Sequence, residues 1–231
     1  MRTFRTTAGP FQEGVYYPDN DIENICRDEL AKVGLLPKEP EPIRIHRFIE
    51  KRFGVSPRYQ DLGNGVLGMT KFTKNGVAEV IVSRALADEG DAVAERRIRT
   101  TLAHEGGHGL LHTHLFLLES ERRPLFGDYS DPSKPKVLCR DETAVGSATY
   151  GRQWWEVQAN KAMGALLLPK ELVQMALKPY LTKAGLLGTE VLTSTNRVAA
   201  VRDLANLFDV NPVVVRIRLV KMYPETGQMS L

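Results

Sequence analysis

The stretch TLAHEGGHGLLH, residues 101–112, dominates the interpretation of this sequence because it contains the pattern His-Glu-x-x-His. Two histidines four residues apart on a helix project from one face about one turn apart, so His104 and His108 can bind one metal ion. Glu105 can then act as general base on a water molecule at that metal. We therefore predict a helix over residues 91–112 that carries a catalytic metal centre.

Glycines are unusually frequent in this predicted helix, at positions 106, 107 and 109. Each glycine inside a helix costs about 1 kcal/mol relative to alanine. The absence of a side chain allows another backbone or a ligand to approach closely. We interpret the three glycines as positions where a second element or a substrate lies against the helix.

A catalytic zinc ion needs a third protein ligand, and His114 is one candidate. It completes the spacing HExxHxxxxxH of metzincin peptidases, in which a glycine bends the chain back toward the metal. Leu111 stands in the place of that glycine and argues against His114. His112 lies a further turn along from His108, so we expect it near the mouth of the site or in a structural role.

The segment WWEVQAN, residues 154–160, offers a glutamate as the other candidate ligand. Glu156 and Asn160 are four residues apart on one predicted helix, which runs to Leu168 and stops at Pro169. Glu156 could bind the metal while Asn160 hydrogen-bonds a ligand histidine. The surroundings of Glu156 are largely apolar, and an isolated charge would be costly there unless it were paired.

Together, HEGGHGLLH at 104–112 and WWEVQANKAMGALLLPKELV at 154–173 resemble the ImmA/IrrE family of zinc metallopeptidases. The pattern of that family is HExxH, followed by a Glu-x-x-Ala-Asn helix that ends in Leu-Leu-x-Pro. The resemblance covers about 30 residues. This sequence departs from the pattern in a longer stretch between the two motifs, and in Gln158, where an acidic residue is common.

The resemblance implies that His104, His108 and Glu156 bind Zn²⁺ and that Glu105 is the catalytic general base. It also implies a minimal thermolysin-like, gluzincin-type fold of the α+β class, mostly helical, with a small antiparallel hairpin and C-terminal helices. Well-known members of the family cleave a partner helix-turn-helix repressor.

The hairpin is predicted independently by two β-rich runs, residues 65–73 and 77–84, which an Asn-Gly turn separates. The second run precedes the motif helix. It could therefore form the sheet edge on which an extended peptide pairs, through Val77, Glu79 and Ile81. An edge strand that is covered by other parts of the protein fits the sequence equally well.

Residues 119–153 contain many turn-forming and charged residues, and we predict one long loop there. Cys139 in this loop could approach the metal as a further ligand, but we favour it as an apolar anchor of the loop. Cys26 is expected in the core. Candidates for stabilising an oxyanion are near the motifs in sequence only: His112, His114, Tyr150 and Arg152.

We divide the chain into a metallopeptidase domain, residues 1–190, and a helical segment, residues 191–231, packed on it. Residues 201–223 resemble a helix-turn-helix. A recognition helix needs several polar side chains for base edges, and the second helix here offers mainly Arg216 and Arg218. The segment therefore favours a structural or repressor-docking role over DNA binding.

The composition agrees with a soluble cytoplasmic protein. The net charge of +3 is too small to suggest nucleic acid, and two cysteines are too few for a disulfide scaffold. Neither a signal peptide nor an apolar run long enough to span a membrane is evident.

The expected function is that of a zinc-dependent endopeptidase that cleaves a regulatory protein, such as a helix-turn-helix repressor. The alternative is a non-proteolytic regulator that binds DNA or a repressor and keeps a structural metal site. Zinc-dependent hydrolysis of a small molecule is a third possibility, because the sequence defines no substrate pocket.

Overall fold

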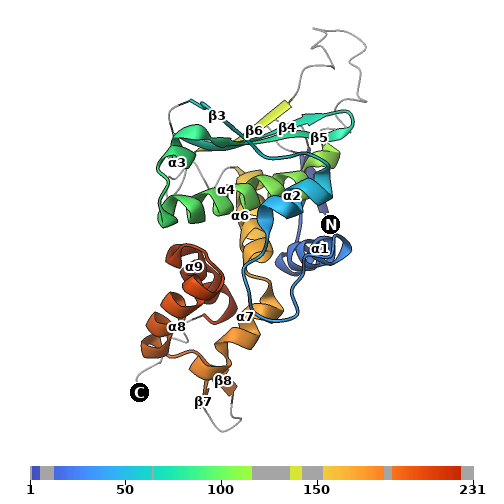
Figure 1. Ribbon diagram of the computed structural model, residues 1–231. Helices are drawn as coiled ribbons and strands as arrows, with labels where there is room; N and C mark the ends of the chain where they lie inside the picture. Colours follow the sequence, from blue (N-terminus) through green and yellow to red (C-terminus); the bar gives the residue numbers. More distant parts are fainter. Residues whose placement is uncertain are drawn as a thin grey trace.

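The computed structural model describes residues 2–5, 13–63, 65–115, 136–141, 153–184 and 189–224. It has an α+β fold in which a sheet lies across one side of a layer of helices (Figure 1). The helices are α1 Asp19–Lys32, α2 Ile45–Phe53, α3 Arg84–Asp88, α4 Ala92–Leu111, α6 Trp154–Leu167, α7 Lys170–Leu177, α8 Ser194–Leu207 and α9 Pro212–Met222. The strands are β1 Arg2–Arg5, β2 Glu13–Tyr16, β3 Arg58–Gln60, β4 Val66–Thr73, β5 Gly76–Ser83, β6 Lys136–Asp141, β7 Thr182–Ala184 and β8 Thr189–Val191.

The predicted hairpin is confirmed as β4 and β5, which pair in antiparallel register. It belongs to a larger sheet with the order β3-β5-β4-β6, in which β3 runs parallel to β5. Strand β5 is therefore an interior strand over residues 81–83, and the prediction that it forms a sheet edge is wrong there. Ile81 pairs with Arg58 of β3 as well as with Met69 of β4, while Val77 and Glu79 pair with β4 and precede the residues that β3 covers.

The prediction of a long loop over residues 119–153 is wrong at 136–141, where β6 pairs antiparallel with β4. The backbone of β4 offers hydrogen-bonding groups on both of its edges, and β6 uses the edge that β5 leaves open. The short run Val137-Leu138-Cys139 supplies residues compatible with a strand, but the turn-formers around it hide the signal. The rest of this predicted loop lies outside the described residues.

Helix α4 begins and ends close to the predicted positions. Asp91 is its N-cap residue, and Oδ1 of Asp91 accepts a 2.7 Å hydrogen bond from the backbone N–H of Ala94. Most of the second half of the helix is buried, because β4 and β5 lie on one side and α2 and α6 on others (Figure 1). The motif residues therefore lie in the interior of the fold.

The glycines of α4 are positions of close approach, as the sequence suggested. A Cβ atom on Gly107 would lie 2.9 Å from the carbonyl oxygen of Ala159 and 2.9 Å from Cβ of Ala162, both on α6. A Cβ atom on Gly109 would lie 2.6 Å from the ring of Phe53. These glycines allow α4 to pack closely against its neighbours, and Gly107 in particular sets the approach of α4 to α6.

We predict that Gly107→Ala lowers the free energy of unfolding by about 1–3 kcal/mol, the usual cost of overpacking. The cause is the backbone oxygen of Ala159, which cannot move away as the end of a flexible side chain can. The matched control is Gly164→Ala on α6, where a new Cβ would meet no atom within 4 Å. That control is expected to gain about 1 kcal/mol from helix propensity. Urea unfolding of both variants measures the difference, and equal stabilisation would contradict the packing argument.

One hydrophobic core includes side chains from α1, α2, β5, α4 and α6 as well as from α8 and α9. Arg218 of α9 also reaches across this core, where Nε donates to the carbonyl oxygen of Leu168 at 3.1 Å and Nη2 pairs with Glu23 of α1 at 2.7 Å. Among the described helices, none combines the length and the apolar character needed to cross a membrane.

Candidate metal centre

Helices α4 and α6 together build a buried group of potential metal ligands. His104 and His108 come from α4, one turn apart, and Glu156 comes from the first turn of α6. One ligand atom from each residue lies within 4.8 Å of the other two. Because Gly107 lets the two helices approach so closely, side chains 48 or more residues apart in sequence converge on one point.

The distances within this group are short. Nε2 of His104 lies 3.0 Å from Oε2 of Glu156, and Nε2 of His108 lies 3.3 Å from Oε1 of the same carboxylate. The His108 nitrogen makes no hydrogen bond among the described residues, although it is buried. Burial raises the pKa of the Glu156 carboxyl, but contacts with His104 and His108 outweigh this effect and hold the pKa well below its usual range.

This group fits a metal ion. Two imidazole nitrogens and one carboxylate form the ligand set of one class of catalytic zinc sites, which leave a further position open for water. A cation between the three side chains would also give the buried His108 nitrogen a partner and would neutralise the buried carboxylate. The residues can therefore bind a metal ion, and the ligand set does not by itself identify which one.

Asn160 contacts His104 at Nδ1, the ring nitrogen that does not face Glu156. Its Oδ1 lies 3.1 Å from Nδ1 of His104 and can accept a hydrogen bond from it. In a neutral ring this leaves Nε2, which lies 3.0 Å from Oε2 of Glu156, as the nitrogen that could bind a metal ion. This is the arrangement that the spacing of Glu156 and Asn160 predicted. An outer hydrogen bond of this kind fixes the orientation of a ligand histidine.

Glu105 follows His104 on α4 and is fully buried. Thr70 of β4 donates a 2.6 Å hydrogen bond from Oγ1 to Oε2 of Glu105. Gly68, two residues earlier on the same strand, lies so close that a Cβ atom there would meet Oε1 of Glu105 at 2.7 Å. Strand β4 therefore fixes the position of this carboxylate.

Sequence reasoning missed the contact of Thr70 with Glu105, although a signal was present. Residues 68, 70 and 72 of β4 are buried in alternation, and Thr70 is the polar one among them. A buried threonine on the inward face of a strand needs a hydrogen-bond partner. Which partner it finds depends on how the sheet packs on α4, and the local sequence does not contain that information.

The other candidate residues lie outside the metal group. Within the described part of the chain the group contains Glu156 and not His114, whose ring contacts Tyr17 with a centroid distance of 6.4 Å. Cys26 is fully buried in the core, as predicted. Cys139 stands opposite Met69 in the register of β6, and its side chain is outside the description. Tyr150 and Arg152 also lie outside the described residues.

His112 is fully buried rather than near the mouth of a site. Its ring contacts His108 on one side and the edge of Trp154 on another. Burial, together with the neighbouring His108, lowers the pKa of His112 well below its ordinary value. His112 is therefore an internal imidazole whose surroundings disfavour the charged form.

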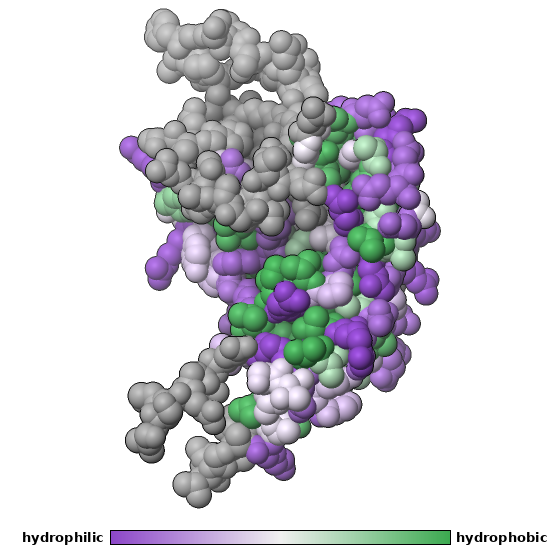
Figure 2. Space-filling model, turned by 90° about the vertical axis from the view of Figure 1, so that its left-hand side faces the viewer, coloured by the Kyte–Doolittle hydropathy of each residue, from purple (hydrophilic) through white to green (hydrophobic). Residues whose placement is uncertain are grey.

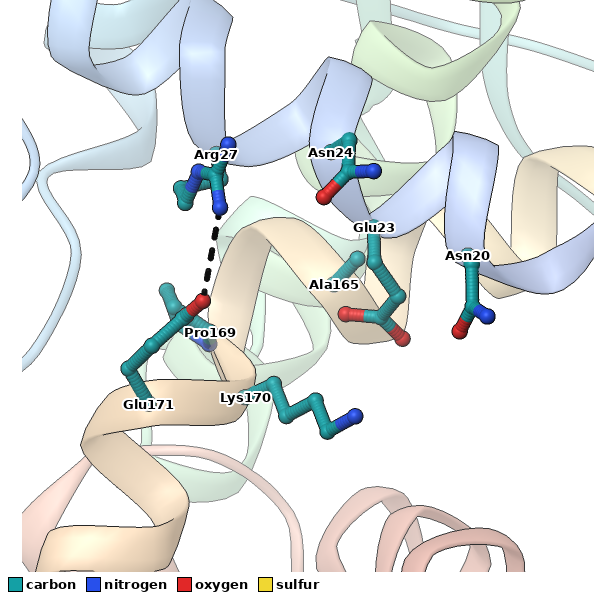
Figure 3. Close-up of a pocket in the computed structure, with 8 residues that line it drawn as sticks. All are labelled: Asn20, Glu23, Asn24, Arg27, Ala165, Pro169, Lys170 and Glu171. Carbon is teal, nitrogen blue, oxygen red and sulfur yellow. Dashed lines mark ion pairs between the residues drawn. The ribbon is translucent and has the colours of Figure 1, made fainter.

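Two hollows on the surface differ sharply in character. A polar one lies between α1 and the start of α7, where Arg27 and Glu171 face each other at 3.7 Å (Figure 3). This ion pair is exposed and therefore contributes little to stability. An apolar one lies between α6 and α9, with Asn160 in its lining, and the face that α9 presents carries hydrophobic side chains (Figure 2).

No protein-family model matches this chain, and no curated protein matches it either.

Proposed function

We propose that this protein is a zinc-dependent endopeptidase. The observation that carries the proposal is the buried group of His104, His108 and Glu156. The buried Glu105 follows His104 directly on the same helix. The two histidines and Glu156 would hold the zinc ion. When bound, zinc supplies Lewis acidity that activates water for attack and polarises the scissile carbonyl.

Other side chains would transfer the proton and hold the reacting groups in position. Glu105 would accept a proton from the attacking water and pass it to the leaving amine. Thr70 holds the Glu105 carboxylate through its hydroxyl, and Asn160 holds the His104 ring with its Nε2 toward Glu156. Burial of the group keeps bulk water away from the charges, so their interactions are stronger than they would be at the surface.

The nature of the substrate and the family are parts of the same proposal. The resemblance of the two motifs to the ImmA/IrrE family supports a minimal thermolysin-like fold and a regulatory protein, such as a helix-turn-helix repressor, as substrate. A cytoplasmic location would follow from such a substrate.

The C-terminal helices favour this function over that of a DNA-binding regulator. Of the two arginines that α9 could offer to DNA, Arg218 is buried and occupied by Glu23 and Leu168. Arg216 stays exposed, beside the apolar Val213, Ile217 and Val220. One arginine among apolar side chains makes a poor surface for reading base edges.

The experiment that tests the proposal is a search for new peptide termini. Purified protein loaded with one equivalent of zinc is incubated with a cell extract, and newly formed N-termini are mapped by mass spectrometry. Cleavage sites should appear with the zinc-loaded protein and disappear when a chelator removes the metal. Failure of the zinc-loaded protein to produce any sites beyond those in the chelated control would overturn the peptidase proposal.

A further inference from the structure

A chain of buried hydrogen bonds leads from His108 away from the metal group. Nδ1 of His108 lies 3.0 Å from Nδ1 of His112, and Nε2 of His112 lies 3.2 Å from Oε1 of Gln158 on α6. Nε2 of Gln158 then donates to the backbone carbonyl oxygen of Val15 on β2 at 2.6 Å. All four residues are buried. This series of hydrogen bonds therefore joins His108 to the backbone of β2, the strand that pairs with β1.

The carbonyl oxygen of Val15 sets the direction of every bond in this chain. A carbonyl oxygen only accepts, so the side-chain amide of Gln158 must turn its NH₂ group toward Val15 and its oxygen toward His112. That oxygen also only accepts, so His112 must carry its proton on Nε2. A neutral imidazole has one protonated nitrogen, so Nδ1 of His112 is then an acceptor.

The contact between His112 and His108 determines which nitrogen of His108 carries the proton. With Nδ1 of His112 as acceptor, the 3.0 Å contact requires His108 to donate from its own Nδ1. In a neutral His108 ring Nε2 then has no proton and is the atom that could bind a metal ion; it lies 3.3 Å from Oε1 of Glu156. A ring nitrogen binds a metal ion through such a lone pair.

We propose that His112 and Gln158 are positioning residues for the metal centre, which hold His108 in the tautomer and orientation that metal binding requires. The proposal rests on the metal-binding part of the proposed function and not on peptide hydrolysis. It also gives a reason for a glutamine at position 158. An acidic residue there would have no N–H group to offer to Val15, and its oxygen would face the carbonyl oxygen instead.

The two histidine ligands are thus held in different ways. Asn160 holds His104 directly, through one hydrogen bond within the α4–α6 pair. His108 is held through two intermediates that end on β2, an element far from α4 in sequence. The position of β2 is therefore coupled to the geometry of the metal centre.

The first test measures zinc affinity by competition with a chromophoric chelator. His112→Leu removes the acceptor for His108, and Gln158→Met removes both contacts of the amide at similar side-chain volume. We expect the dissociation constant for zinc to rise about 10- to 100-fold in these variants, the usual range for loss of an outer partner. The matched control is His114→Leu, which removes a half-buried histidine two residues away that takes no part in the chain of hydrogen bonds.

The second test reads the tautomers directly from the ¹⁵N spectrum of the imidazole rings in the zinc-loaded wild-type protein. The proposal requires His112 to carry its proton on Nε2 and His108 on Nδ1. A proton on Nδ1 of His112 would overturn it, as would a His112→Leu variant that is folded and binds zinc as tightly as His114→Leu. A wild-type protein that binds no zinc at all would instead overturn the metal centre, and with it this proposal.

Discussion

A Glu105→Gln variant is expected to bind zinc like the wild-type protein and to lose peptide cleavage by about 10²- to 10⁴-fold. Glutamine has the shape of glutamate but cannot accept the proton of the attacking water. Its side chain is not one of the three that form the metal group, so the ligands stay in place. The amide oxygen can still accept the hydrogen bond from Thr70, and the position of the side chain is thereby kept.

The measurement compares zinc content and cleavage of a substrate identified in the search for new termini. Glu95→Gln is the matched control, because Glu95 is an exposed glutamate in the first turn of the same helix. It should leave both quantities unchanged. Normal cleavage by the Glu105→Gln variant would remove Glu105 from the mechanism, whereas loss of zinc would show that the carboxylate contributes to the metal site itself.

Loss of Glu156, the proposed third ligand, should have the other large effect. We expect Glu156→Ala to weaken zinc binding by more than about 100-fold, which is the upper end of the range for removal of a mere outer partner. Two imidazoles would then remain without the carboxylate that lies 3.0 Å from one and 3.3 Å from the other. Zinc per chain after dialysis, together with chelator competition, measures the effect.

Two further variants make this result interpretable. Glu156→Gln preserves the volume of the buried side chain, so a shared loss of zinc in both variants points to the charge and not to a cavity. Glu171→Ala removes an exposed glutamate and should leave zinc binding unchanged. Zinc retained by a folded Glu156→Ala protein would contradict the assignment and move the third ligand to His114 or Cys139.

Features of the fold that depend on local sequence were predictable. Asp91 caps α4, an Asn-Gly turn joins β4 to β5, and Pro169 follows the end of α6. Pairing between distant segments was not predictable. Strands β3 and β6 flank the hairpin, and both are short. A strand acquires its neighbours through backbone hydrogen bonds that any sequence can make, so the side chains of β5 did not reveal that it is interior.

The metal group could be predicted because residues four apart in sequence lie on the same face of a helix. His104 and His108 share a helix face, as do Glu156 and Asn160, and only the pairing of the two helices had to be inferred from the resemblance. The contacts of Thr70 and Gln158 depend instead on where β4 and β2 lie in the folded chain. Gln158 stood out in the sequence only as a departure from the motif.

The carbonyl oxygen of Val15 has a consequence for mutational tolerance. A main-chain atom is present whatever the side chain, so position 15 should accept any residue that fills the same apolar space beside Phe72 and Trp155. Positions 112 and 158 contribute through side-chain atoms and should tolerate almost nothing else. A saturation scan scored by metal retention would thus find position 15 permissive and positions 112 and 158 restrictive, although hydrogen bonds join all three.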